Sequence, residues 1–459
     1  MRQLERRHFL AQMAAAAASV SAGGFWAHAD EGPISRKVFR DRSVVLLFLQ
    51  GGPSHLEFFD PKMSAPAEIR SRTGEVKTKH AGVTFGGTFP KLAAMTDKFS
   101  IVRSYGSQNY QHNYRYVVSG GNPLKAVVGA VYAHLAGSVN PATGIPQHVL
   151  LLPEAVQPGL KLEMNVEAER MPSLTDPGLL GPAYAAFDPA TGGDLKDDMT
   201  LSLSPTRFDE RRTLLERLDR IERTHAGEAR FARQRQNHRQ AYEVLSRGVA
   251  DAFDLSREDP RVVAKYDTSS LYPVNEFAKW KDLWRATNLL GRQMLLARRL
   301  CQAGCGFITI SDGGWDMHAD GETPNDMKAI WPKGRQVDHA VSVFLEDIEQ
   351  LGLSDKILLV VTGEMGRTPR VNDNGGRDHY GELTPLLLAG GGVPAGHVIG
   401  STDRYAERAT SAPYTPANLF STILHSLLDI TQLRLERGVS PDLLRYIDQN
   451  APISFRGGA

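Results

Sequence analysis

The chain has 459 residues, and its 53 Lys and Arg residues nearly balance its 52 Asp and Glu residues, which gives a formal net charge of +1. This balance argues against a protein that binds nucleic acid or an anionic membrane surface through its charge. Beyond the N-terminal region, no apolar stretch is long enough to cross a bilayer, so we expect no stable membrane anchor.

The N-terminal region has the pattern of a secretory signal. Arg6 and Arg7 precede an alanine-rich apolar run over residues 11–22, and Ala27 and Ala29 offer the small residues that a signal peptidase requires. The adjacent arginines indicate the twin-arginine kind of signal, whose partner is the twin-arginine export machinery. We therefore expect residues 1–29 to be removed and the mature chain to be periplasmic or extracellular. An amphipathic first helix of the fold is the alternative.

Six short apolar runs alternate with helical patterns along the rest of the chain. Strands alternating with helices predict an α/β fold with a mostly parallel central sheet and helices on both faces. We expect the runs at 43–49, 306–311 and 357–362 to be neighbouring parallel strands at its centre. The other predicted strands are 99–102, 148–152 and 386–389, and the clearest helical patterns are 336–351 and 416–428.

The segment 205–247 differs from its surroundings. It is strongly charged, and Leu214, Leu215, Leu218 and Ile221 recur at helical spacing. This pattern predicts a helical insertion or lid within one domain that spans the mature chain, residues 30–459. A plain covering helix of the main fold is the alternative.

Polar side chains follow the predicted strands at the points where these strands end. In sheets of this kind, ligands bind beyond the carboxyl ends of the strands. Asp316 and His318 follow the run at 306–311, and His379 lies on a loop that enters the last predicted strand. Two histidines and a carboxylate are a ligand set for zinc or another divalent first-row metal. We therefore predict that these three residues bind a metal.

Three further charged residues lie at the same predicted edge. Glu364 follows the run at 357–362, where it would act as a metal ligand, as a general base or as the acceptor that orients a histidine. Arg367 and Arg377 would bind an anionic oxygen group in bidentate fashion, or form salt bridges to Glu364 or Asp378.

The chain resembles the bacterial family catalogued as domain of unknown function 1501. The shared motifs extend over nearly the whole chain and occur in the family's order. They are the twin-arginine start, 50–55 (QGGPSH), 59–62 (FDPK), His112 before Ser119-Gly120, 314–318 (GWDMH), 363–369 (GEMGRTP), 376–379 (GRDH), 389–392 (AGGG) and the segment 413–428.

The resemblance implies a sulfatase-like protein of the alkaline phosphatase superfamily, with a metal-centred site for phosphate or sulfate esters. Asp316, His318 and His379 look like one of the two metal-ligand sets of that superfamily. The second set is altered, because Gln50 stands where an aspartate is usual and Glu364-Met365 stands where an Asp-His pair is usual. Methionine is a poor ligand for zinc and similar divalent ions, so we expect one metal site rather than two.

The superfamily's nucleophile is not found at its expected place. Counting back from Gly120 leads to Tyr110, and the absence of a cysteine there argues against a formylglycine sulfatase. Tyr110, His112, Ser54 and His55 all stay open as nucleophiles.

Three functions are compatible with these features. The first is a metal-dependent hydrolase of a small-molecule or polymeric anionic ester. Glu364 or His112 would move protons, His112 and His55 would face the same cleft, and Arg367 would bind the anionic group. The second is an exported binding or accessory protein with a degraded metal site, and the third is a lyase or mutase that uses one metal.

Overall fold

The computed structural model describes residues 34–190, 207, 210, 213 and 249–455. The predicted signal peptide lies outside the described residues, and so does the predicted insertion at 205–247, apart from residues 207, 210 and 213. Among the residues that the structure describes, no helix combines the length and the apolar character that crossing a bilayer requires.

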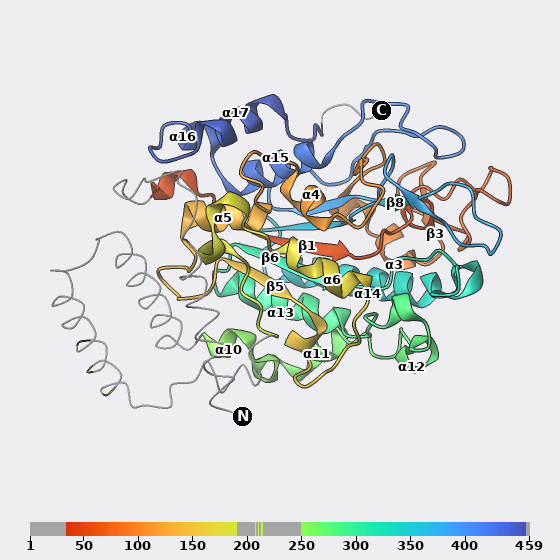
Figure 1. Ribbon diagram of the computed structural model, residues 1–459, viewed down its shortest axis with the longest axis horizontal. Helices are drawn as coiled ribbons and strands as arrows, with labels where there is room; N and C mark the ends of the chain where they lie inside the picture. Colours follow the sequence, from red (N-terminus) through yellow and green to blue (C-terminus); the bar gives the residue numbers. More distant parts are fainter. Residues whose placement is uncertain (1–33, 191–206, 208–209, 211–212, 214–248, 456–459) are drawn as a thin grey trace.

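A seven-stranded sheet forms the centre of the molecule, in the order β11-β4-β10-β7-β1-β6-β5 (Figure 1). The three central strands are parallel neighbours, as predicted, because β1 pairs with β7 on one side and with β6 on the other. Only β10 runs against its neighbours among the described strands of this sheet. The strands are β1 (Ser43–Leu49), β4 (Ser100–Val102), β5 (His148–Leu151), β6 (Phe307–Asp312), β7 (Ile357–Gly363), β10 (Leu387–Gly390) and β11 (Val398–Ile399).

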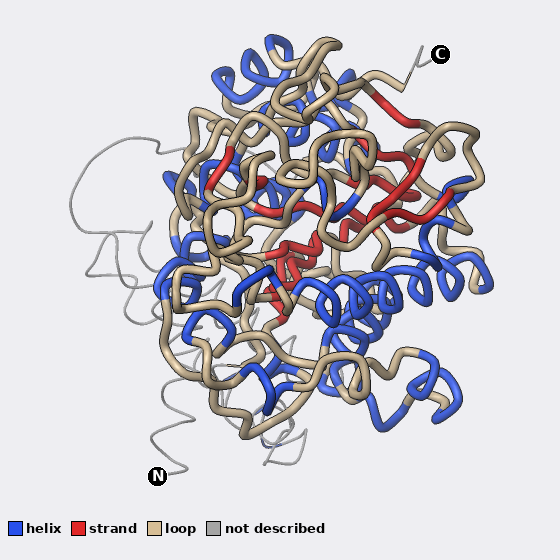
Figure 2. The backbone as a smooth tube through the Cα atoms, turned by 90° about the vertical axis from the view of Figure 1, so that its right-hand side faces the viewer, coloured by secondary structure: helices blue, strands red, loops and turns tan. Residues whose placement is uncertain are grey.

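Helices cover both faces of the sheet, which confirms the predicted architecture (Figures 1 and 2). Successive side chains of a strand point to opposite faces, so alternate residues of β1 enter different cores. Val45, Leu47 and Leu49 pack in one core with α13 (Leu290–Gln302) and α14 (Ile330–Gln350). Val44, Leu46 and Phe48 pack in the other with α5 (Val128–Ala136) and α15 (Pro416–Leu427). A strand buried on both faces reads as one continuous apolar run, which explains why β1 was recognisable in the sequence.

Helix α14 begins six residues earlier than the sequence pattern indicated. Pro332 and Gly334 read as helix breakers, but Pro332 lies in the first turn, where proline removes no helical hydrogen bond. Gly334 is required by packing, because a Cβ atom there would lie 2.3 Å from Oγ1 of Thr88.

Smaller elements connect these layers. Two short antiparallel ribbons pair β2 (Glu75–Lys77) with β3 (Thr84–Gly86), and β8 (Gly366–Arg367) with β9 (His379–Tyr380). The other α-helices within the described residues are α2 (His55–Phe58), α3 (Pro90–Ala93), α4 (Tyr114–Ser119), α6 (Val166–Arg170), α10 (Ala250–Phe253), α11 (Pro260–Lys265), α12 (Val274–Phe277), α16 (Ile430–Leu433) and α17 (Pro441–Gln449).

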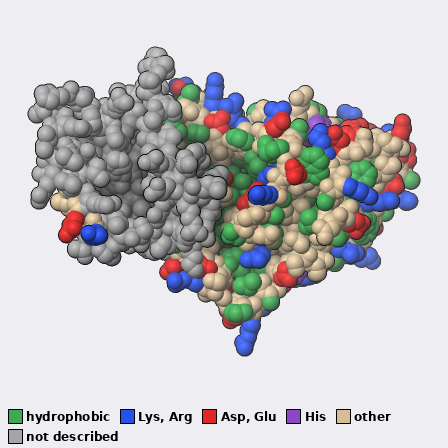
Figure 3. All heavy atoms as spheres, turned by 60° about the horizontal axis from the view of Figure 1, so that its bottom comes forward, with side chains coloured by type: hydrophobic (Ala, Val, Ile, Leu, Met, Phe, Trp, Pro, Cys, Tyr) green, Lys and Arg blue, Asp and Glu red, His purple; other side chains and the backbone are tan. Residues whose placement is uncertain are grey.

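The surface carries both signs of charge. Acidic and basic side chains are interspersed over the coloured part of the face in Figure 3, and apolar side chains lie between them. This mixture agrees with the formal net charge of +1 for the whole chain.

Candidate functional site

Segments that are far apart in the sequence meet at one edge of the sheet. The parallel strands β1, β6 and β7 deliver the residues that follow them to this edge. Strand β10 is antiparallel to β7, so the loop that precedes it, with Arg377 to His379, reaches the same edge.

The loops after β1 and β6 touch backbone to backbone: the amide of Trp315 donates to the carbonyl of Gln50 at 3.0 Å. Gly51 has a φ of +109°, and a Cβ atom there would lie 2.3 Å from the amide nitrogen of Asp316, so only glycine permits this approach.

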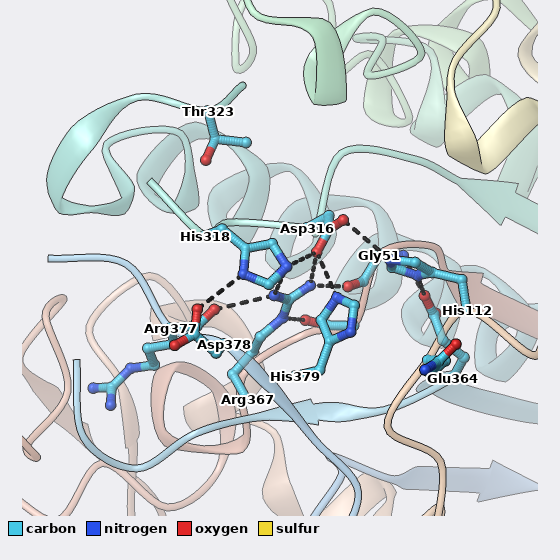
Figure 4. Close-up of polar contacts among 12 residues, drawn as sticks. Gly51, His112, Asp316, His318, Thr323, Glu364, Arg367, Arg377, Asp378 and His379 are labelled. Atoms are coloured by element: carbon cyan, nitrogen blue, oxygen red, sulfur yellow. Dashed lines mark hydrogen bonds and ion pairs between the residues drawn. The ribbon is translucent and has the colours of Figure 1, made fainter. Parts of the chain in front are cut away.

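The carboxylate of Asp316 is the centre of the site (Figure 4). Its Oδ1 atom lies 2.9 Å from Nε2 of His318 and 3.3 Å from Nε2 of His379. Its Oδ2 atom lies 3.0 Å from Nε2 of His112. The guanidinium of Arg367 forms an ion pair with Oδ1. One buried carboxylate therefore receives three imidazoles and one guanidinium.

Each of these imidazoles is also held from the outside. The Nδ1 atom of each ring lies within hydrogen-bond distance of an oxygen on the side away from Asp316 (Figure 4). An outer acceptor of this kind fixes the tautomer and the orientation of a ring that binds metal through its other nitrogen. The pairs are His112 with Oε1 of Glu364 at 2.7 Å, His318 with Oδ1 of Asp378 at 3.0 Å, and His379 with the carbonyl of Tyr110 at 3.1 Å.

Burial and charge act in opposite directions on the ionisable groups here. Burial alone would raise the pKa of Asp316, but Arg367 and the three histidines hold that pKa well below its usual range. Burial would lower the pKa of His112, but its hydrogen bonds to Asp316 and Glu364 prevail and raise this pKa to about 10. The pKa of each group therefore shifts toward its charged form, because the imidazole of His112 lies between the carboxylates of Asp316 and Glu364.

Three of these residues fit a metal ion. The potential ligand atoms of His112, Asp316 and His379 all lie within 4.8 Å of one another. Two ligands of one tetrahedral zinc ion lie about 3.3 Å apart, given Zn–N distances near 2.0–2.1 Å, so small side-chain rotations would complete such a site. A further buried oxygen nearby, Oε2 of Glu364, has no hydrogen-bond partner among the described residues.

A comparison with known protein families identifies the family of this chain. Residues 41–436 match the family model described as "Protein of unknown function (DUF1501)". The chain belongs to the DUF1501 family. No curated protein matches the chain.

Solved structures resemble this DUF1501 protein only weakly. Ps i-CgsB has a TM-score of 0.30 and 9% identity, over 90% of this chain and 77% of that one. The phosphonate monoester hydrolase SpPMH from Silicibacter pomeroyi has a TM-score of 0.28 and 11% identity, over 84% and 73%. A protein of the alkaline phosphatase superfamily from Vibrio parahaemolyticus has a TM-score of 0.29 and 10% identity, over 92% and 75%. At these scores the observed sheet, rather than any neighbour, carries the fold assignment.

The group of potential ligand atoms around Asp316 and His379 includes His112, whereas the sequence pattern indicated His318 as the third ligand. His318 also contacts Asp316, but its Nε2 atom lies 3.2 Å from Nη1 of Arg367 as well. In the sequence, only its motif pointed to His112. This residue lies in the loop before α4, and no long strand precedes that loop.

The two arginines have different partners from those expected. Arg367 pairs with Asp316, and Arg377 pairs with the buried Glu57 at 3.1 Å. The alternative of salt bridges to Glu364 or Asp378 is therefore not found among the described contacts of these arginines. Arg377 is fully buried, and its nitrogens donate to Glu57 and to backbone carbonyls, so it braces the loop that carries His379.

His55 does not join the described network around Asp316. Its Nε2 atom lies 3.0 Å from the carbonyl of Ala406, and its ring stacks on Tyr380 with centroids 6.4 Å apart. Burial lowers its pKa to about 4, so it is a neutral side chain of the protein interior.

Two other nucleophile candidates, Tyr110 and Ser54, are not activated by their described contacts. The hydroxyl of Tyr110 donates to Glu382, and this hydrogen bond raises its pKa to about 12. The hydroxyl of Ser54 is buried and has no described hydrogen-bond partner. A nucleophile needs a base or a metal that promotes its ionisation. The contact with Glu382 makes Tyr110 harder to ionise, and Ser54 has no described base beside it.

Buried polar groups that the sequence did not indicate contact the segment just before Asp316. Lys333 of α14 lies 2.7 Å from both carboxylate oxygens of Asp312, and both residues are buried. The indole nitrogen of Trp315 donates to the same carboxylate at 2.8 Å. Glu167 accepts from the amide of Gly314 at 2.6 Å. A lysine on the apolar face of α14 was the available signal, because a buried lysine requires a partner.

Proposed function

We propose that this DUF1501 protein is an exported, metal-dependent hydrolase of phosphate or sulfate esters, sulfatase-like in its chemistry. The observation that carries the proposal is the arrangement of three imidazole Nε2 atoms around one buried carboxylate, with every Nδ1 atom held by an outer oxygen. Such outer contacts are typical of metal-binding histidines.

His112, Asp316 and His379 would hold the ion, with zinc as the first choice for this donor set. The ion would polarise an ester oxygen and promote the ionisation of water. The missing side-chain nucleophile favours water as the attacking group. His318, held by Asp378, would then donate a proton to the leaving oxygen.

Glu364 would have two tasks. Its Oε1 atom receives the amide of Gly51 at 2.8 Å and holds the ring of His112. Its Oε2 atom is buried without a described partner and would accept the proton that the attacking water loses.

Export by the twin-arginine route is part of the proposal. It rests on the arginine pair, the apolar run and the small residues before position 30. Replacing both Arg6 and Arg7 with lysine should leave the precursor in the cytoplasm, and normal secretion of that variant would refute this route.

A non-catalytic binding or accessory protein is the second candidate. It is favoured by Arg367, whose guanidinium already pairs with Asp316, and by Gln50 and Met365 at positions where the superfamily places ligands. A guanidinium that neutralises the central carboxylate would weaken its affinity for a cation.

A panel of aryl phosphate, phosphonate and sulfate esters separates the two candidates. The hydrolase predicts turnover of at least one ester, its loss on treatment with a chelator, and its return when zinc is added. The Asp316→Asn variant should be inactive under all these conditions, whereas Asp320→Asn, a change in the exposed loop nearby, should leave turnover intact. Absence of turnover in metal-loaded protein across the panel would leave the binding protein as the better explanation.

A further inference from the structure

A cavity lies near the Asp316 site, and its lining includes no residue of that site. Its volume is about 510 Å³, which is within the range of about 300–1,000 Å³ usual for small-molecule pockets. Its walls come from two segments, residues 63–74 before β2 and residues 326–331 at the start of α14.

The cavity has an aromatic and apolar part. Trp331 is one of its lining residues and is 39% exposed, which is unusual for a side chain of this size. Met63 and Ala67 line the cavity with it. The guanidinium of Arg335 lies 5.7 Å from the centre of the Trp331 ring, so a cation already braces the indole.

The cavity is also basic. Arg70, Arg72 and Lys328 line it, and Asp326 is the only acidic residue among its lining residues. Asp326 is paired with Arg72 at 2.8 Å, which leaves the charges of Arg70 and Lys328 unbalanced within the lining. Both of these side chains belong to exposed residues and could reach an anionic group in the cavity.

A single turn separates this cavity from the Asp316 site. On the cavity side, the amide of Asp326 donates to the carbonyl of Asn374 at 3.0 Å. On the other side, the side-chain amide of Asn372 donates to the carbonyl of His318 at 2.7 Å. The cavity wall and the loop that carries His318 therefore lie on either side of the turn at 372–375.

The backbone at the cavity wall is strained. Asp326 and Met327 are consecutive non-glycine residues with φ values of 57° and 49°. Such conformations cost roughly 1–3 kcal/mol each and concentrate at ligand-binding segments. Here they set the path of the chain directly before Lys328.

We propose that this cavity, between Trp331 and the cations Arg70 and Lys328, binds a sulfated or phosphorylated sugar unit of an oligosaccharide whose ester lies at Asp316. The inference rests on the proposed function and names the substrate class of that site. A sugar ring has an apolar face of C–H groups that packs on an indole, and its anionic substituents would pair with the arginine and the lysine.

An acidic peptide is the competing ligand. It would use the cations, but extended peptides are usually bound through main-chain hydrogen bonds to a strand edge or through pockets that follow each other along a groove. The cavity is formed by a loop and the start of a helix rather than by a strand edge. This arrangement favours a compact charged ring over a peptide chain.

Calorimetric titration of the whole exported protein tests the inference. The probe is a fully sulfated heparin hexasaccharide, and chelator is present so that no turnover is needed for the signal. We expect binding by the wild-type protein, with the desulfated hexasaccharide and hexaglutamate at least about tenfold weaker. Trp331→Ala and the double variant Arg70→Gln/Lys328→Gln should each weaken binding of the sulfated probe about tenfold or more, as loss of a central aromatic or charged anchor does.

Trp280 provides a control outside the cavity, because it is a half-buried indole with a cation, Lys279, 5.4 Å from its ring centre. Trp280→Ala and Lys279→Gln should leave the affinity unchanged, and circular dichroism of each variant verifies its fold. Equal affinity of the Trp331 and Trp280 variants, or equal binding of hexaglutamate and the sulfated probe, would overturn the inference. Because binding is measured without turnover, failure to hydrolyse any ester would count against the proposed function alone.

Discussion

The Nδ1 atom of His112 lies 2.7 Å from Oε1 of Glu364, and the same carboxylate oxygen receives the amide of Gly51 at 2.8 Å. This contact links the loop before α4 to the ends of β7 and β1. It turns the other nitrogen of His112 toward Asp316 at 3.0 Å. The orientation of His112, a proposed metal ligand, therefore depends on Glu364, which lies 252 positions later in the sequence.

Glu364→Gln tests the double role of this residue. Glutamine keeps an acceptor for His112 but cannot take up a proton, so turnover should fall by more than the metal content does. Loss of an outer partner of a ligand costs about 10–100-fold in affinity or activity. Metal analysis and ester turnover of the same preparation give the two values, and Glu68→Gln, at a partly exposed carboxylate paired with Arg370, is the control. Equal losses of metal and turnover would make Glu364 a ligand instead.

Alanine variants of the three histidines separate ligands from neighbours. His112→Ala and His379→Ala should each release the metal, because both ligand atoms belong to the group within 4.8 Å. His318→Ala should retain more metal and lose turnover, since His318 is assigned to the proton step. The metal content of the purified variants is the measurement. The opposite ranking, with His318→Ala depleted and His112→Ala loaded, would restore the ligand set that the sequence indicated.

The buried pair Lys333–Asp312 should couple strongly. Lys333→Met leaves Asp312 buried beside Trp315 without its cation, and breaking a buried pair in this way typically costs about 3–5 kcal/mol. Lys333→Met/Asp312→Asn removes both charges and should recover part of that loss. Urea unfolding of the wild type, the two single variants and the double variant gives the coupling energy. Additive effects of the two substitutions would show that Lys333 and Asp312 are not energetically coupled.

His148 should make the folded protein sensitive to acid. Burial lowers the pKa of this residue to about 4 from an ordinary value of 6.5, so the folded state favours its neutral form. Its stabilising contribution is complete above pH 6.5 and is lost as the pH falls toward 4. The loss amounts to about 3 kcal/mol, from 1.36 kcal/mol per pKa unit.

The substitution His148→Phe tests this statement, because it keeps a ring beside Phe307 and removes the titration. Its free energy of unfolding should depend less on pH between 6.5 and 4 than that of the wild type. His55, whose pKa is lowered in the same way, keeps its own contribution in both proteins. The half-buried His397 supplies the control His397→Gln. Parallel stability profiles of His148→Phe and wild type would show that His148 does not titrate as described.

The central strands of the sheet could be predicted from the sequence because they are buried. Strands β1, β6 and β7 are enclosed on both faces, so each reads as an uninterrupted apolar run that ends in polar residues. The antiparallel direction of β10 has no such signature, since direction depends on the path of the connecting loops. That direction brings His379 to the same edge as Asp316.

The individual contacts of the site were less predictable. Arg367 and Arg377 stand near several carboxylates in the sequence, and only the folded loops select Asp316 for one and Glu57 for the other. Glu57 lies 320 positions before its partner, so no local pattern relates the two residues. The position of His112 likewise depends on a loop without regular structure.

Metal content of the exported protein is the most direct test of a metal-dependent site at Asp316. Wild-type protein and the Asp316→Asn variant would be purified side by side after export by their own signal and analysed for all first-row metals. We expect close to one divalent ion per wild-type chain and almost none in the variant. Wild-type protein that contains no stoichiometric metal, or a variant that retains as much metal as the wild type, would contradict it.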